Sequence, residues 1–333
     1  MTSTNAANAQ FVTDTEQFRR ELLAHCYRLV GSLDEAEDLV QEAYLRAWRS
    51  YAGFEGRSSV RVWLYRIATN VCLSTLSNRS RRVLPSGLGA PTDDPDAPTP
   101  EAAPEVGWLD PFPDALADPA MIVADREGLR LALIASLQYL PARQRAVLIL
   151  RDVLAFSASE VAGILETSVA AVKSALQRAR ARLDEVAPNA ENLAEPTEPA
   201  IQALLAAYIA AFEHADPALL TEVLRKDASI EVVGTSTWFD GKTTCLGYLA
   251  RVTGAPGDWR MLPTSFNGQP AAAAYLRDVD GVARAWGIGL LTTTSTHITR
   301  IIAFGNPALV GKAGLPMILE SIVDIQAPAA TAP

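Results

Sequence analysis

The sequence predicts three folded units: two all-α domains, the second ending in a helix-turn-helix, and a C-terminal α+β domain. At 333 residues the chain is too long for one ordinary domain. Nine of its 21 prolines fall within 83–124, which forbids long helices there and marks a linker. Helical periodicity flanks this linker, and alternating strand patterns appear only in the last third. We therefore place the units at 14–82, 125–187 and 200–318.

The composition is that of a folded protein with an uneven charge distribution. Hydrophobic residues make up 49% and charged residues 20%, which excludes wholesale disorder. The net charge of −9 at first argues against a DNA-binding protein. However, residues 1–82 carry 11 basic and 9 acidic groups, and residues 125–187 carry 9 and 7. The linker carries 8 acids and no Lys or Arg, so two weakly basic domains flank an acidic segment.

Cysteine usage and hydropathy predict a cytoplasmic protein. Cys26, Cys72 and Cys245 form no CxxC pair, so we expect buried thiols and neither a disulfide framework nor a metal site. No apolar run approaches the ~18 residues of a membrane span, and the polar N-terminus lacks a signal-peptide core. We expect no membrane partner and no cofactor.

In the first unit, Ser32 and Glu35 form an S-x-x-E capping box that predicts a helix start. An apolar stripe follows at helical spacing (Ala36, Leu39, Val40, Ala43, Ala47 and Trp48). The polar face carries Glu37, Asp38, Gln41 and Glu42. Residues 54–70 then combine a Gly-containing loop with a second helix.

The second unit ends in a helix-turn-helix pattern. A helix is expected from Leu140 through Arg151, and Ser157 with Glu160 forms a second capping box. After a turn, the last helix is expected to bury Val169, Val172, Leu176, Ala179 and Leu183. Its other side presents small and polar residues flanked by basic ones, as a recognition helix does: Ala170, Lys173, Ser174, Gln177, Arg178, Arg180 and Arg182.

The third unit reads as helices followed by a meander of strands, an α+β cone. Helices are expected at 204–214, from Asp216-Pro217 and at 243–252, the last after a turn at 238–242. Strands are expected at 228–233, 259–266, 271–278, 282–291 and 297–304. Asn267-Gly268 and Asp280-Gly281 are expected hairpin turns.

Several stretches in this order resemble the extracytoplasmic-function group of bacterial RNA polymerase sigma factors, in the sigma-70 family. Asp34 to Glu42 (DEAEDLVQE) resembles the family's core-binding motif, and Phe54 to Asn70 resembles the segment that melts and reads the −10 promoter element. Leu140 to Asp152 and Ser157 to Leu183 resemble the fourth conserved region, which reads the −35 element. The resemblance covers about residues 15–185.

The resemblance implies that Glu37, Asp38, Gln41 and Glu42 bind core RNA polymerase, on the coiled coil of its largest subunit. Without the neighbouring motifs, a solvated helix face would be the better interpretation of these charges.

Promoter DNA is the second implied partner. Melting promoter DNA requires that bases be trapped outside the stack and that the freed strand be held. Phe54, Ser58 and Asn70 are candidate base-pocket residues. Arg57, Arg61 and Arg66 are candidate phosphate contacts, whereas Trp63 is expected in the core. Residues 79–82 either hold duplex phosphates or form an exposed helix end.

The linker has two interpretations, which are compatible. The resemblance implies that it threads into the polymerase's active-site and RNA-exit path, where its acids would occupy a basic channel. It also suits a flexible tether that fixes the −10 to −35 spacing.

The third unit looks like a SnoaL-like domain of the nuclear-transport-factor-2-like superfamily, as fused to a subgroup of these sigma factors. Asn267-Gly-Gln-Pro-Ala271 and Phe304-Gly-Asn-Pro307 carry this resemblance. Such folds often enclose a pocket, and the candidate lining residues are Trp238, Tyr275, Trp286 and His297. The resemblance implies regulation, through an intramolecular contact with the sigma domains or a small ligand.

Three functions therefore compete. The first is a promoter-specificity subunit of RNA polymerase, regulated by its C-terminal domain and not an enzyme. The second is a free-standing helix-turn-helix regulator, which the small positive charge of 125–187 disfavours. The third is a SnoaL-like isomerase or hydrolase, which would need an acid-base pair such as Asp240 with His297.

Overall fold

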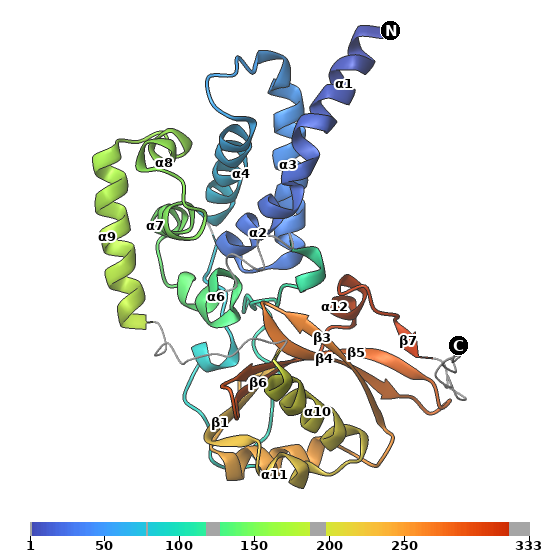
Figure 1. The fold of residues 1–333 in the computed structure, drawn as a ribbon. Coiled ribbons are helices and arrows are strands. Elements are labelled where there is room, and N and C mark those ends of the chain that lie inside the picture. The colour runs from blue at the N-terminus through green and yellow to red at the C-terminus, as the bar shows by residue number, and fades with distance from the viewer. Residues whose placement is uncertain (1, 78, 118–126, 187–197, 320–333) are drawn as a thin grey trace, which may run out of the picture.

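The computed structural model describes residues 2–77, 79–117, 127–186 and 198–319 (Figure 1). The first unit is helical, with one helix before the expected start. Its elements are α1 (Thr2–Thr15), η1 (Glu16–Phe18), α2 (Arg19–Val30), α3 (Leu33–Ser50), η2 (Tyr51–Gly53) and α4 (Val60–Leu76). Gly31 ends α2 in the left-handed conformation (φ 72°), a position that favours glycine. No described helix is long and apolar enough to cross a membrane.

The second unit contains the predicted helix-turn-helix. Its elements are η5 (Glu127–Leu129), α6 (Leu131–Leu137), α7 (Ala142–Leu148), the π turn η6 (Ile149–Val153), α8 (Ala158–Ile164) and α9 (Val169–Val186). The capping box at the start of α8 is confirmed, because Ser157 Oγ accepts from Glu160 N (3.2 Å) and Glu160 Oε2 accepts from Ser157 N (2.7 Å). The expected burial of Val169 is wrong, since it is 39% exposed, and Leu176 and Leu183 are only half-buried.

The third unit places helices against a seven-stranded sheet, the α+β arrangement expected. Its helices are α10 (Pro199–Glu213), η7 (Pro217–Leu220), α11 (Lys242–Val252) and α12 (Pro307–Lys312). Its strands are β1 (Leu224–Val233), β2 (Trp238–Asp240), β3 (Trp259–Phe266), β4 (Gln269–Arg277), β5 (Ala283–Thr293), β6 (Ile298–Phe304) and β7 (Ile318–Leu319).

The sheet is only partly the predicted meander. The strand order is β2-β1-β6-β5-β4-β3, with β7 on β5. Strands β3 to β6 follow one another as antiparallel neighbours, but β1 lies parallel to β6. Residues 238–240 form edge strand β2 where a turn was expected, and α12 and β7 were not predicted.

The hairpin between β3 and β4 forms at the predicted dipeptide. Phe266 pairs with Gln269, which leaves a two-residue loop. Asn267 (φ 54°) and Gly268 (φ 64°) both have positive φ, as a type I′ turn requires.

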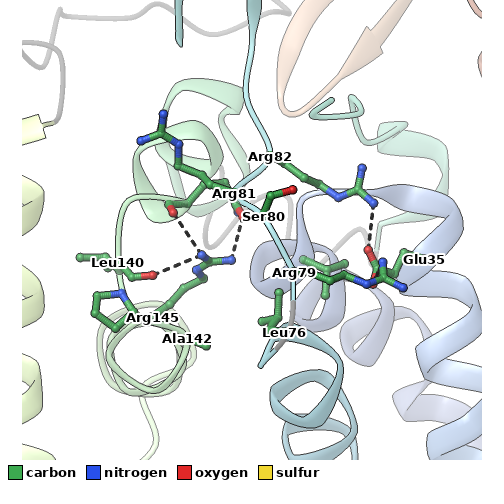
Figure 2. A pocket seen from close by; sticks show the side chains of 12 residues that line it. Glu35, Leu76, Arg79, Ser80, Arg81, Arg82, Leu140, Ala142 and Arg145 are labelled. Carbon is green, nitrogen blue, oxygen red and sulfur yellow. Dashed lines mark hydrogen bonds and ion pairs between the residues drawn. The ribbon is translucent and has the colours of Figure 1, made fainter. Parts of the chain in front are cut away.

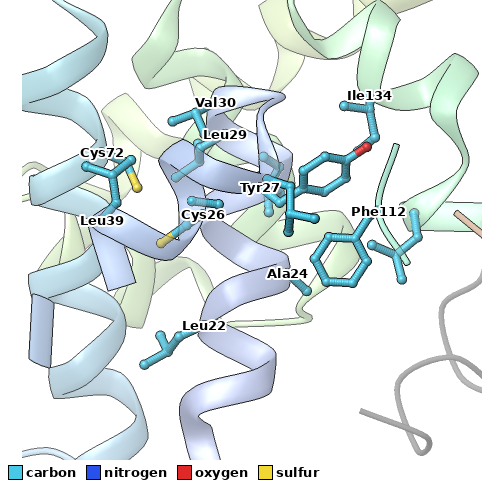
Figure 3. Packing of buried hydrophobic residues seen from close by; sticks show 14 of the residues in the cluster. Leu22, Ala24, Cys26, Tyr27, Leu29, Val30, Leu39, Cys72, Phe112 and Ile134 are labelled. Atoms are coloured by element: carbon cyan, nitrogen blue, oxygen red, sulfur yellow. The ribbon is translucent and has the colours of Figure 1, made fainter. Parts of the chain in front are cut away.

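One hydrophobic cluster joins all three units. It contains helix residues such as Tyr27, linker residues such as Phe112, and sheet residues such as Tyr275. Figure 3 shows Tyr27 and Phe112 packed together, with ring centroids 4.9 Å apart. The cysteines are buried free thiols, as predicted. A hydrogen bond with Cys26, and then burial, raise the pKa of Cys72.

The described part of the linker, 83–117, runs out along the C-terminal domain and returns, since Val83 N donates to Gly107 O (2.9 Å) and Leu109 N donates to Val83 O (3.0 Å). Thr92 N donates to Trp238 O (2.9 Å) and Ala102 N donates to Gly234 O (2.9 Å). Ser86 N donates to the fully buried carboxylate of Glu231 (2.8 Å). In this arrangement the linker is therefore held by both backbone and side-chain contacts, and the rest of the linker, 118–124, lies outside the described residues.

Candidate functional site

The acidic stripe lies on α3, whose start is fixed by two caps. Ser32 Oγ accepts from Glu35 N (3.5 Å), and Asp110 of the linker accepts from Leu33 N (3.2 Å). The reciprocal half of the predicted capping box does not form. Glu35 instead pairs with Arg79 through Oε1 and with Arg82 through Oε2 (2.9 Å), so both of its carboxylate oxygens are taken by cations.

The four candidate core-binding residues differ in accessibility. Asp38 and Gln41 are exposed, whereas Glu42 is half-buried and pairs with Arg46 (2.7 Å). Glu37 is half-buried because Lys312 of α12 donates to its Oε2 (2.8 Å) and also contacts Asp34. The C-terminal domain therefore covers one end of the stripe.

The exposed face of α3 continues past the acids. Leu45 is 50% and Trp48 49% exposed, and with Gln41 they are spaced i, i+4, i+7 on one side of the helix. Trp48, the last residue of the predicted apolar stripe, therefore lies at the surface of the molecule.

The candidate −10 residues divide into a loop group and a helix group. Phe54 packs on Trp63, with ring centroids 4.9 Å apart, and Trp63 lies in the core as predicted. Ser58 is exposed just before the N-cap Ser59. Asn70, also exposed, lies about 16 Å further along the helix axis at 1.5 Å per residue. Asn70 therefore does not share a pocket with Phe54 and Ser58.

The three candidate phosphate-binding arginines are not equally available. Arg57 and Arg66 are exposed, although Arg57 pairs with Glu55. Arg61 makes two hydrogen bonds to Glu21 (3.1 Å each), and its guanidinium lies 4.6 Å from the ring centroid of Phe156. Phe156 precedes α8, so Arg61 connects the two helical units.

The candidate −35 residues lie along the outer face of α9. All of them are exposed: Ala170, Lys173, Ser174, Gln177, Arg178, Arg180 and Arg182. Val172 and Ala179 are buried on the opposite side, as the predicted periodicity requires. Figure 1 shows α9 at one side of the molecule, away from the sheet. Arg180 is held by Asp152 (2.7 and 2.8 Å), and Arg178 donates to Ser174 (2.8 Å).

The hairpin turn at Asn267 is the junction of the three units, a role that the sequence reasoning missed. The Asn267 side chain donates to Tyr27 Oη (3.0 Å) and Leu129 O (2.6 Å), and it accepts from Phe112 N (2.8 Å). These partners belong to the first unit, the second unit and the linker. Burial raises the pKa of Tyr27, so its hydroxyl stays protonated.

Two further side chains strengthen this junction. Gln269 accepts from Leu131 N (3.2 Å) and donates to Leu291 O (3.1 Å). Asn306 caps α12 by accepting from Ala308 N (3.1 Å), with Pro307 in the first turn, and α12 carries Lys312 to α3. The asparagines of both motifs that carried the SnoaL-like resemblance therefore support contacts with the first unit.

The predicted pocket in the C-terminal domain is not formed by its four candidates. Trp238 is on edge strand β2, where its indole donates to Gly89 O of the linker (2.8 Å). Tyr275 is fully buried on β4, and Trp286 lies near the start of β5. His297 lies in the turn beyond the other end of β5, with its ring on Thr296 (2.8 Å). The packed sheet separates these positions.

The acid-base pair required by the enzyme alternative does not form either. Asp240 is exposed on β2 beside β1, and His297 lies in the turn that leads into β6. Among the described residues, no group of three or more His, Cys, Asp or Glu side chains is arranged to hold a metal ion.

Comparisons with known proteins agree with this architecture. The model of sigma-70 region 2 matches residues 15–82, and that of sigma-70 region 4 matches 130–183. The chain is 48% identical over 312 residues to the ECF RNA polymerase sigma factor SigG of Mycobacterium tuberculosis, covering 92% of this chain and 84% of SigG. It is 31% identical over 168 residues to the ECF RNA polymerase sigma-E factor of Escherichia coli K12, covering 50% and 81%.

The fold extends the likeness through the C-terminal domain. The crystal structure of the Mycobacterium tuberculosis extracytoplasmic function sigma factor SigJ matches with a TM-score of 0.57 at 24% identity, covering 92% of this chain and 99% of SigJ. Because the match to SigG spans most of both chains at high identity, the family follows directly: this chain belongs to the ECF RNA polymerase sigma factors.

Proposed function

We propose that this sigma factor binds core RNA polymerase through α3, reads the −10 element through 54–70 and the −35 element through α9, and is held closed by its C-terminal domain. It acts in the cytoplasm and has no catalytic activity of its own. The observation that carries the proposal is the ion pair of Lys312 with Asp34 and Glu37, because it links the C-terminal domain to the helix assigned to polymerase.

Charge complementarity supports the assignment of α3. Glu37, Asp38 and Glu42 would meet a basic surface of the polymerase, and Lys312 occupies the position that such a base would take. Core polymerase and Lys312 would then compete for the same carboxylate.

The contacts between the helical units support the closed state. The −10 and −35 elements lie about 25 base pairs apart, or about 85 Å at 3.4 Å per base pair. Arg61 and Tyr65 of α4 both contact Phe156, whose ring centroid is 4.9 Å from that of Tyr65. While Arg61 and Tyr65 contact Phe156, residues 54–70 and α9 cannot reach the −10 and −35 elements at the same time. Regions 2 and 4 must therefore separate before both elements are bound.

Run-off transcription with purified core polymerase tests the proposal. The full chain should initiate from its promoters, and Asp38→Lys with Glu42→Lys should weaken core binding about ten-fold or more while leaving the fold intact. Lys312→Glu should increase the affinity for core polymerase. Lys226→Glu, at an exposed position of β1, is the matched control. Unchanged core affinity in the α3 variant would refute the docking assignment.

A further inference from the structure

A cationic cavity of about 220 Å³ lies between region 2 and region 4 (Figure 2). Its region 2 wall consists of Glu35 and the segment Arg79 to Arg82 that follows α4. Its region 4 wall comes from the start of α7 and includes Arg145. Figure 2 shows Arg79 and Arg82 converging on Glu35, with Arg145 on the other side.

The charges that line this cavity do not balance. Four arginines and one carboxylate line it, and only Arg79 and Arg82 pair with that carboxylate. The guanidinium of Arg81 lies 3.9 Å from the ring centroid of Tyr139. The lining therefore has an excess of about three positive charges, which attracts an anion.

Arg145 is the most deeply buried of the four. It is 5% exposed, and it donates to the carbonyl oxygens of Leu29, Gln138 (3.3 Å) and Leu140 (3.2 Å) and to the side-chain oxygen of Gln138 (2.7 Å). No carboxylate of the described residues pairs with it, and its buried Nε has no hydrogen-bond partner. Burial lowers its pKa to about 10, as expected for a cation that lacks a counter-charge.

We propose that this cavity binds a small anion with one or two phosphate groups. The guanidinium fork donates in pairs to phosphate oxygens, so it suits this chemistry better than a point charge would. The cavity is smaller than the ~300 Å³ at which pockets for drug-sized ligands begin, which favours a compact anion. Because both regions contribute lining residues, the bound anion stabilises their closed arrangement.

Promoter DNA is a second source of phosphate groups that could bind these arginines. Arg79, Arg81 and Arg82 are candidate duplex contacts, and Arg79 and Arg81 are exposed. A duplex cannot enter the cavity to reach Arg145, whereas a small anion can. Dependence on Arg145 therefore separates the two sources.

Calorimetric titration of the full chain with inorganic pyrophosphate tests the proposal. One site is expected, and Arg79→Gln should weaken binding about ten-fold through loss of a charge-assisted hydrogen bond. Arg145→Lys should weaken it by a similar factor. Glu35→Gln should tighten it several-fold, because it removes the one carboxylate among the described lining residues. Arg20→Gln, at an exposed position outside the cavity, should leave it unchanged.

Three results would overturn the inference: no binding, equal losses in Arg79→Gln and Arg20→Gln, or full displacement of pyrophosphate by a promoter duplex with no effect of Arg145→Lys. If Arg145→Lys fails to fold, the opposite signs expected for Arg79→Gln and Glu35→Gln still decide. The assay contains no polymerase, so its outcome is independent of the transcription test.

Discussion

At the scale of single residues, Asn267 carries more of the architecture than its place in a turn suggests. Its positive φ fits the turn, and its side-chain amide forms hydrogen bonds with region 2, the linker and region 4. A buried amide with three hydrogen bonds is costly to remove, because the partners remain buried without water. This residue adds polar contacts to the hydrophobic cluster that joins the three units.

Asn267→Gly should separate these two roles. Glycine keeps the positive φ but removes all three side-chain hydrogen bonds, so the free energy of unfolding should fall by about 3 kcal/mol. Urea unfolding followed by fluorescence measures this change. Asn306→Gly, which removes one exposed cap, is the comparison and should cost about 1 kcal/mol or less. Equal losses in the two variants would contradict the junction role.

The buried His25 makes a separate prediction about pH. Its ring contacts Thr69 Oγ1 (2.9 Å), and burial, with a contribution from Arg28, lowers its pKa to about 3. The unfolded chain protonates this histidine near pH 6.5 while the folded chain does not, so stability falls as pH falls below 6.5. From pH 6 to pH 5 the loss from this group should approach about 1.4 kcal/mol.

Urea unfolding at several pH values checks that slope. A His25→Gln variant should lose this part of the pH dependence, whereas His297→Gln, at a half-buried turn position, should retain it. An unchanged slope in His25→Gln would mean that other groups control acid stability.

At the scale of elements, the helices and the hairpins could be predicted from sequence because their signals are local. The capping box at Ser157, the periodicity of α9 and the Asn267-Gly268 turn all form as expected. The parallel pairing of β1 with β6 could not, because it joins strands that are far apart in the chain. The same applies to the approach of α12 to α3.

For the candidate site too, local features could be predicted from the sequence and contacts between units could not. Exposure of the α9 face followed from helical periodicity, and so did exposure of Asp38 and Gln41. The engagement of Arg61 by Glu21 and Phe156 depends on the packing of two units, and no local pattern encodes it. The four pocket candidates failed for the same reason, because strand position decides which side chains meet.

The helix proposed to read the −35 element, α9, gives the prediction for this scale. Replacing Ser174 and Gln177 with Ala should change the preferred −35 sequence and leave the fold unchanged. Each base that these side chains no longer read should cost about 1–3 kcal/mol of discrimination. Selection from a randomised promoter library, transcribed by the reconstituted holoenzyme, measures this preference. Substitution of Ser159 and Glu166, which are exposed outside α9, is the control. If the α9 variant and the control variant select the same −35 consensus, the −35 element is recognised by another surface.

At the scale of the whole molecule, the charge distribution and the packing describe one closed state. The acidic linker runs along the C-terminal domain, and Lys312 covers part of the acidic stripe of α3. The threading of the linker into polymerase, as the family resemblance implies, would require these backbone contacts to break. Under the proposed function, docking on polymerase and closure by the C-terminal domain would therefore be alternative uses of the same surfaces.

The most direct test is the distance between region 2 and region 4 in solution. Fluorescent labels at Ser74→Cys on α4 and Ala181→Cys on α9 report it, since both positions are exposed and the native cysteines are buried. The free full chain should show efficient energy transfer, and core polymerase with promoter DNA should reduce it toward the value for about 85 Å. Low transfer in the free chain, or transfer that does not change in the complex, would contradict closure by the C-terminal domain.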